Sequence, residues 1–323
     1  MKLRAIRTAV IMLLLTALSA AVFAYADSDK IEYDSSVYYD SREEAASALR
    51  GAMKDRENYV TVAIYERVDE ESIKTIIGDV FNMAIEHTGK PDEGDYLKYQ
   101  FADYKGKAAT DLHWGRPVVI IRYVINYYTN AEQEKLTNLE VKSILKELDL
   151  KGKSDYQKIR AIHDYLCDNI EYDTEKSGDD KGGTEHTAYG ALVQGRSVCQ
   201  GYAISMYRLL LESGVDCRVI DGEGKEAGGI SSAHSWNIVS IGGVYFYVDT
   251  TWDDSSGSLE YFLRNRDDFE ADHVTSEEYD KDFLTEKYPV SQSGYPADYD
   301  TPIKALNKAT AALVSAFDLL DAA

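Results

Sequence analysis

The chain has 323 residues, 44% of them hydrophobic and 28% charged, which suits a folded protein of one large domain or two modest ones. Acidic residues outnumber basic residues by 56 to 35, and the formal net charge is −21. We expect no nucleic-acid binding, because that function relies on a basic stripe that replaces phosphate counterions, and the sequence has none.

The first 26 residues have the pattern of a secretory signal peptide. A basic start that includes Lys2 precedes an apolar run over 9–21 and an A-x-A site that ends at Ala26. The run is short for a bilayer and no Lys/Arg cluster follows it, so an uncleaved anchor is the less favoured alternative. We therefore expect cleavage after Ala26 and a secreted protein that is not integral to a membrane.

Residues 27–132 are expected to form an N-terminal α+β accessory region, in which we find no chemical motif. A helix is predicted over 41–53, with Ser41 as N-cap and Glu44 completing a capping box. Apolar periodicity predicts further elements in chain order: a strand over 60–65, a helix over 71–87 and a strand over 117–128.

Residues 133–290 are expected to form a second domain that carries the chemistry. Helical spacing of apolar residues predicts helices over 137–148 and 154–170, and a third helix is predicted over 203–211. Strands are predicted over 217–220, 234–241 and 244–252, the last two on either side of a glycine pair. A polar loop is expected over 173–183. Residues 291–323 are expected to form a linker and a C-terminal helix.

Cys199 is the candidate nucleophile. A nucleophilic thiol needs a lowered pKa, a base within hydrogen-bonding reach and a group that orients the base. Cys199 follows the turn 195–197 and directly precedes a predicted helix. The N–H groups and the dipole of a helix N-terminus stabilise a thiolate, and the same N–H groups can form part of an oxyanion hole. A merely buried thiol is the alternative.

The glycine pair at 242–243 predicts the register of the last two strands. Two such residues between β-rich runs are a strong hairpin signal, and a two-residue loop makes Ile241 pair with Val244. In this register His234 falls opposite Thr251.

The same register makes His234 and Asp249 diagonal neighbours on the face that also carries Trp236. Diagonal neighbours have Cα atoms about 7–8 Å apart, which their side chains can bridge. We expect Asp249 to accept the Nδ1–H of His234 and to leave Nε2 facing the thiol.

Three segments resemble, in the same order, the signature blocks of the transglutaminase-like superfamily: GRSVCQGYA (195–203), AHSWNIV (233–239) and YFYVDTTWDD (245–254). The resemblance covers about residues 135–270. It implies a papain-like α+β core, in which a helix that carries the cysteine packs on an antiparallel sheet. It also implies that Cys199, His234 and Asp249 are the catalytic cysteine, histidine and aspartate.

Other candidates carry less weight. Three cysteines are too few for a disulfide framework, so Cys167 and Cys217 are expected to be packed thiols, with a disulfide between them as the minor alternative. The six histidines show no metal-binding spacing, and we expect no metal and no other cofactor. His273 is expected to be a structural hydrogen-bonding group.

The second hydrogen-bond donor of the oxyanion hole stays open among three candidates: Trp236, Tyr189 and Gln200.

The sequence thus predicts a secreted cysteine enzyme that transfers acyl groups. Cys199 would form a thioester with an amide substrate, and water (peptidase or amidase) or an amine (transglutaminase) would resolve it. We favour a peptidase slightly, and we expect a protein or peptide substrate, extracellular or in a cell wall. The oligomeric state stays open. A non-catalytic surface-binding or structural module on the same fold is the alternative.

Overall fold

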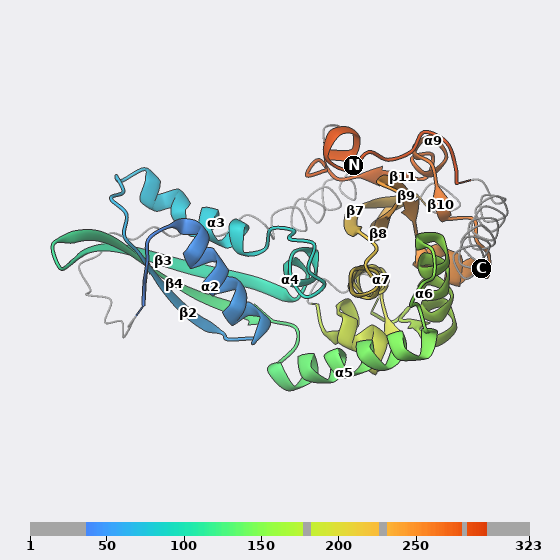
Figure 1. Ribbon diagram of the computed structural model, residues 1–323, viewed down its shortest axis with the longest axis horizontal. Helices are drawn as coiled ribbons and strands as arrows, with labels where there is room; N and C mark the ends of the chain where they lie inside the picture. The colour runs from blue at the N-terminus through green and yellow to red at the C-terminus, as the bar shows by residue number, and fades with distance from the viewer. Residues whose placement is uncertain (1–36, 177–181, 226–230, 280–282, 296–323) are drawn as a thin grey trace, which may run out of the picture.

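A computed structural model of the protein describes residues 37–176, 182–225, 231–279 and 283–295. The predicted signal peptide, its cleavage site at Ala26 and the predicted C-terminal helix lie outside these residues. Within the part of the chain that is described, no helix is long and apolar enough to cross a membrane. Figure 1 shows α2, α3 and the first sheet at one end of the molecule, and α6, α7 and the second sheet at the other.

The first sheet belongs to the predicted accessory region and has the strand order β1-β2-β4-β3. Its elements, with the two helices that accompany them, are β1 (Tyr38–Tyr39), α2 (Arg42–Lys54), β2 (Tyr59–Ile64), α3 (Ser72–Ala84), β3 (Phe101–His113) and β4 (Arg116–Tyr127). The core between helices and sheet includes Leu49, Phe81 and Tyr123, all almost fully buried.

The elements predicted for this region are confirmed within a few residues, but β3 was not predicted. Its sequence is rich in polar residues, because much of the strand is exposed to solvent. The cap of α2 is also confirmed: Ser41 Oγ accepts a hydrogen bond from the N–H of Glu44 at 3.2 Å. The reciprocal bond of the capping box differs, since the Glu44 carboxylate accepts from the N–H of Asp40, not of Ser41.

Three helices follow: α4 (Asp95–Lys98), α5 (Ala131–Leu148) and α6 (Asp155–Asn169). α5 begins at Ala131 and not at 137 as predicted, because Asn130 and Gln133 form a capping box at its N-terminus. α6 has the predicted bounds within a residue.

The second sheet has the strand order β10-β9-β8-β7-β11, with every neighbouring pair antiparallel. The elements of this part are β5 (Glu171–Tyr172), η1 (Thr184–His186), η2 (Tyr189–Val193), β6 (Arg196–Ser197), α7 (Cys199–Glu212), β7 (Cys217–Lys225), β8 (Ser231–Ile241), β9 (Val244–Val248), α8 (Thr250–Ser256), β10 (Phe262–Arg264), α9 (Arg266–Phe269), β11 (His273–Thr275) and η3 (Phe283–Lys287). The predicted α+β class, with the cysteine helix packed on an antiparallel sheet, is confirmed.

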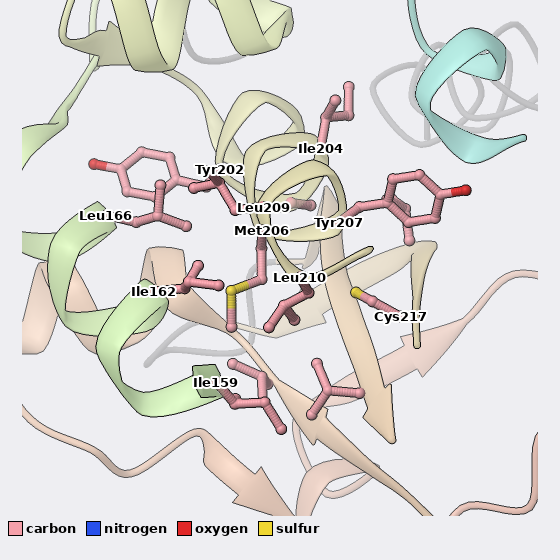
Figure 2. Packing of buried hydrophobic residues seen from close by; sticks show 14 of the residues in the cluster. Ile159, Ile162, Leu166, Tyr202, Ile204, Met206, Tyr207, Leu209, Leu210 and Cys217 are labelled. Carbon is pink, nitrogen blue, oxygen red and sulfur yellow. The ribbon is translucent and has the colours of Figure 1, made fainter. Parts of the chain in front are cut away.

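α7 is the central helix of this core. Every residue from Gly201 to Leu210 is buried, so the helix is covered on all sides. Figure 2 shows Met206 and Leu210 of α7 close to Ile159 and Ile162 of α6, with Cys217 at the start of β7 nearby. Side chains packed this tightly hold the helix in one position, and the place of its first residue, Cys199, is thereby fixed.

A buried ion pair joins the two regions of the chain. Arg218 on β7 donates to both carboxylate oxygens of Asp95 on α4, at 2.7 and 2.8 Å, and the N–H of Val219 donates to the same carboxylate. The side chains of Arg218 and Asp95 are 9% and 4% exposed. Each charge therefore depends on the other for stabilisation.

We expect Asp95→Ala to lower the free energy of unfolding by about 3–5 kcal/mol, because it leaves the buried guanidinium of Arg218 without its partner. Lys135→Ala is the control, since it breaks an ion pair with Glu132 whose side chains are 68% and 70% exposed. Such a pair contributes less than about 1 kcal/mol. Urea unfolding of both variants measures the difference, and equal losses would contradict the role given to Asp95.

Candidate active site

Cys199 is the first residue of α7, and Val198 is its N-cap. The first N–H groups of a helix have no intrahelical acceptor, and they carry the positive end of the helix dipole. Cys199 thus lies at the end of α7 where free N–H groups and the positive end of the dipole face an incoming negative charge. The sequence placed Cys199 directly before the helix; the structure places it in the first turn, with the same consequence.

The turn before α7 is held against residues 184–187. Ser197 Oγ and the N–H of Val198 both donate to the carbonyl oxygen of Glu185, at 2.5 and 3.0 Å. A Cβ atom on Gly201 would lie 1.8 Å from Ser197 Oγ and 3.0 Å from the carbonyl oxygen of Thr187. Only glycine allows this close approach, which explains the glycine two residues after Cys199.

His234 on β8 and Asp249 after β9 form a buried pair. The distance from His234 Nε2 to Asp249 Oδ2 is 2.6 Å, and the side chains are 6% and 1% exposed. Asp249 is also the N-cap of α8: its Oδ1 accepts from the N–H groups of Thr251 and Trp252 at 3.0 and 3.1 Å. One carboxylate thus caps a helix with one oxygen and binds the imidazole with the other.

The predicted hairpin register is confirmed as far as β9 extends, from Ile241 opposite Val244 to Asn237 opposite Val248. The predicted continuation of the strand to 252 is wrong. β9 ends at Val248, and α8 begins at Thr250, so Thr251 does not lie opposite His234. Aspartate is a favoured N-cap residue, and this was the available signal for a helix start at Asp249.

The predicted assignment of the ring nitrogens of His234 is also wrong. Nε2, and not Nδ1, binds Asp249. Nε2 is farther from the backbone than Nδ1, and it is this outer nitrogen that reaches the carboxylate of Asp249, which lies one residue beyond the end of β9. An ionised carboxylate only accepts hydrogen bonds, so Nε2 donates its proton. Nδ1 is left for another partner.

Cys199 and His234 are close enough to affect each other's chemistry. Burial by itself lowers the pKa of His234, but the charge and the hydrogen bond of Asp249, together with a hydrogen bond to Cys199, raise it to about 10. Burial opposes ionisation of Asp249, yet His234 and His273 outweigh it and hold the pKa of that carboxyl well below its usual range. At neutral pH the pair is therefore an imidazolium and a carboxylate.

Residues 142–250, which include Cys199, His234 and Asp249, match the family model of the Transglutaminase-like superfamily. This segment is a transglutaminase-like domain. Its helix and antiparallel sheet agree with the fold that the three sequence blocks imply.

The chain is also similar to two curated proteins and one solved structure. It is 33% identical to mouse (Mus musculus) kyphoscoliosis peptidase over 144 residues, which are 40% of this chain and 22% of the relative. It is 29% identical to the human (Homo sapiens) kyphoscoliosis peptidase over 116 residues, 34% of this chain and 17% of the relative. The chain thus spans about a fifth of the length of these relatives. A crystal structure of a TGase aligns with a TM-score of 0.33 at 12% identity, covering 62% of this chain and 57% of its own.

The aromatic ring of Trp252 covers His234 in the transglutaminase-like domain. The two rings are stacked, with centroids 5.3 Å apart. A Cβ atom on Gly224 of β7 would lie 2.7 Å from the Trp252 ring and 3.4 Å from His234 Cδ2. Glycine at this position leaves the room that the tryptophan occupies. Trp252 therefore limits the positions that the imidazole can adopt.

Sequence reasoning did not place His273 in the site. The ring of His273 is almost fully buried; its Nε2 lies 3.1 Å from Asp249 Oδ2, and its Nδ1 lies 2.7 Å from Asp272 Oδ1. It is a hydrogen-bonding group, as predicted, but its partner is the same carboxylate oxygen that His234 binds. His273 lies beyond the matched segment, and no sequence spacing links it to Asp249.

The potential ligand atoms of His234, Asp249 and His273 lie within 4.8 Å of one another, which is a geometry that a metal ion could use. The expectation of no metal rested on sequence spacing, and spacing cannot detect residues that different strands bring together. The hydrogen bonds from both imidazoles to Asp249 account for the short distances among these groups.

The candidates for the second oxyanion donor differ in their surroundings. The amide of Gln200 donates to the carbonyl oxygens of His186 and Tyr99 at 3.0 and 3.4 Å, so its N–H groups have partners. Trp236 Nε1 is buried and has no hydrogen-bond partner among the described residues. Tyr189 is the first residue of η2. The donor stays a prediction.

Cys167, Cys199 and Cys217 are all free thiols, which excludes the minor alternative of a disulfide between Cys167 and Cys217. Cys217 is fully buried, and burial raises the pKa of its thiol well above the ordinary value. Cys167 is partly buried on α6, with its sulfur 3.9 Å from both ring nitrogens of His163. The prediction that both thiols are packed is confirmed.

Proposed function

We propose that the protein is a cysteine acyl-transfer enzyme in which Cys199 is the nucleophile, His234 the acid and base, and Asp249 the group that orients His234. The observation that carries the proposal is the buried His234–Asp249 pair next to the thiol at the start of α7. The match of residues 142–250 to the Transglutaminase-like superfamily supports it.

The reaction begins with attack of the Cys199 thiolate on an amide carbonyl. A bond forms between the sulfur and the carbonyl carbon, and the first N–H groups of α7 are placed to stabilise the oxyanion. His234 Nδ1 gives its proton to the leaving amine as the C–N bond breaks. Water or a second amine then attacks the thioester, His234 accepts the proton of this nucleophile, and the thiolate is released.

The substrate we propose is a protein or peptide amide outside the cell, because the first 26 residues have the pattern of a signal peptide. The name of the mouse and human relatives, kyphoscoliosis peptidase, favours water as the acceptor. The triad itself does not choose between water and an amine, since the shape of the cleft and the exclusion of water decide that.

The test is to incubate reduced protein with a mixture of peptides and a labelled primary amine, and to analyse the products by mass spectrometry. Peptide hydrolysis identifies a peptidase, and covalent incorporation of the amine identifies a transglutaminase. Cys199→Ala should form neither product. If the unchanged protein forms no product and no adduct with a thiol-directed electrophile, the non-catalytic module is favoured over the enzyme.

The alkaline limit of activity should reflect the pKa of His234. The imidazolium is the form that protonates the leaving amine, and a pKa of about 10 keeps His234 in that form well above its ordinary value of 6.5. We therefore expect kcat/KM for an amide substrate to be retained through neutral pH and to fall as pH rises through about 10. A pH profile of kcat/KM measures this limit. A decline centred near 6.5 would show that Asp249 does not raise the pKa of His234.

A further inference from the structure

His273 has one defined position in the fold. It is the first residue of β11 and pairs with Gly224 of β7. Its ring stacks on Phe269 with centroids 3.9 Å apart, and the Trp252 ring lies against it at 4.3 Å. Rings packed on two sides leave the imidazole little freedom to turn. The directions of its two nitrogens are thereby set by the packing.

Each ring nitrogen of His273 points at a carboxylate. Nδ1 lies 2.7 Å from Oδ1 of Asp272, and Oδ2 of Asp272 accepts a hydrogen bond from the hydroxyl of Tyr261 at 2.8 Å. Nε2 lies 3.1 Å from Oδ2 of Asp249. Asp272 thus holds the ring from one side, and the other side is directed at the carboxylate that orients His234.

Asp249 accepts four hydrogen bonds in this arrangement. Two backbone N–H groups of α8 bind Oδ1, and the imidazoles of His234 and His273 bind Oδ2. A carboxylate oxygen offers two lone pairs, so the donors occupy the capacity of both oxygens. Rotation or protonation of the carboxylate would break at least one of these bonds. His273 therefore fixes the lone pair of Oδ2 that remains for His234.

We propose that His273 is a positioning residue: it holds Asp249 so that His234 donates from Nε2 and presents Nδ1 to Cys199. The assignment rests on the proposed function, because it acts through the carboxylate that orients the base. Loss of the His273 donor frees one lone pair of a buried carboxylate, and Asp249 can then turn away from His234. The alternative is that His273 only fills space beside Phe269 and Trp252.

Two amide substitutions separate these roles. The side-chain nitrogen of glutamine replaces Nε2 of histidine in position and reaches Asp249, whereas the nitrogen of asparagine replaces Nδ1 and reaches Asp272. His273→Gln and His273→Asn lose the same aromatic packing and bury the same polar group. They differ in which carboxylate keeps its donor, so they form a matched pair.

His163→Asn is the second control. His163 is also a buried imidazole between two carboxylates. One of them is Asp253, which lies on α8, one helical turn after Asp249. The hydrogen bonds of His163 go to Asp253 and Asp164. Asparagine keeps the donor to Asp164 and loses the donor to Asp253, so the substitution removes a donor from a carboxylate of α8 but none from Asp249.

The experiment measures two quantities in the reduced full chain. The first is the rate at which iodoacetamide alkylates Cys199 at pH 7, followed by peptide mass spectrometry. The second is the ring-proton and ring-nitrogen NMR signal of His234, which reports whether Nε2 carries the proton. We expect His273→Asn to slow alkylation by about tenfold, the usual effect of losing a hydrogen bond to a charged group, and to remove the single Nε2–H state of His234. His273→Gln should stay within about threefold of the unchanged protein, and so should His163→Asn.

Equal rates for His273→Gln and His273→Asn, or an unchanged His234 signal in His273→Asn, would overturn the positioning role. If either amide prevents folding, as judged by thermal unfolding, His273→Leu replaces it, because leucine keeps the apolar packing and donates no hydrogen bond. We expect His273→Leu to slow alkylation of Cys199 and to remove the single Nε2–H state of His234. Failure of the proposed function looks different: Cys199 in the unchanged protein would then react no faster than Cys167. The NMR signal of His234 still decides the role of His273 in that case.

Discussion

His234→Ala is expected to lower the rate of acyl transfer from an amide substrate by about 10³-fold. In the proposed reaction His234 protonates the leaving amine and later accepts the proton of the second nucleophile, and such acid–base catalysis typically contributes about 10²–10⁴-fold. Among the described residues, the neighbouring imidazole of His273 is no substitute, because its Nε2 is directed at Asp249 and its Nδ1 at Asp272. The measurement is product formation per mole of enzyme, by mass spectrometry.

His163→Ala is the matched control for this prediction. It removes an equally buried imidazole from α6, with its bond to Asp253, but no group that touches Cys199 or His234 in the proposed reaction. We expect it to destabilise the fold and to retain activity within about tenfold at a temperature where it stays folded. A His234→Ala variant that keeps more than a tenth of the activity would contradict the role given to His234.

Asp249→Asn is expected to lower activity by about 10²-fold or more, because the amide cannot accept hydrogen bonds from both imidazoles and carries no charge to hold His234 as imidazolium. The amide oxygen can still cap α8. Asp249→Ala loses this cap as well, and we expect it to be less stable than Asp249→Asn by about 1 kcal/mol. Activity assays and urea unfolding of the two variants separate the two functions of one side chain.

The control for this pair is Asp253→Asn, on the same helix. Asp253 is buried and binds His163 through Oδ2 at 3.0 Å and the N–H of Tyr261 through Oδ1 at 2.8 Å. We expect Asp253→Asn to lower the free energy of unfolding about as much as Asp249→Asn does, and to change the activity of the folded protein little. Equal losses of activity for Asp249→Asn and Asp253→Asn would mean that the helix α8, and not the carboxylate of Asp249, is what matters.

The sequence predicted the parts of the site that depend on local patterns. The position of Cys199 next to the N-terminus of a helix follows from the turn before it, although the helix was predicted over 203–211 and α7 begins four residues earlier, at Cys199. The register of β8 and β9 follows from the glycine pair at 242–243. A two-residue hairpin loop leaves few registers open. The approach of His234 to Asp249 could therefore be derived without coordinates.

The features that were missed depend on contacts between residues far apart in the sequence. The helix α8 begins where a strand was predicted, because Asp249 caps it and the capping signal was weaker than the β-rich pattern before it. His273 reaches Asp249 only through the pairing of β11 with β7. The ion pair of Asp95 and Arg218 spans the two regions of the chain. Pattern and spacing hold no information on such contacts.

The most direct test of the account is the reactivity of the three thiols towards iodoacetamide at neutral pH, mapped by peptide mass spectrometry. The account predicts rapid alkylation of Cys199, slow alkylation of Cys167 and almost none of the buried Cys217. It also predicts that in His234→Ala the alkylation of Cys199 is no faster than that of Cys167. Equal alkylation of Cys199 and Cys167, or selectivity for Cys199 that persists in His234→Ala, would show that the imidazole held by Asp249 does not activate the thiol at the start of α7.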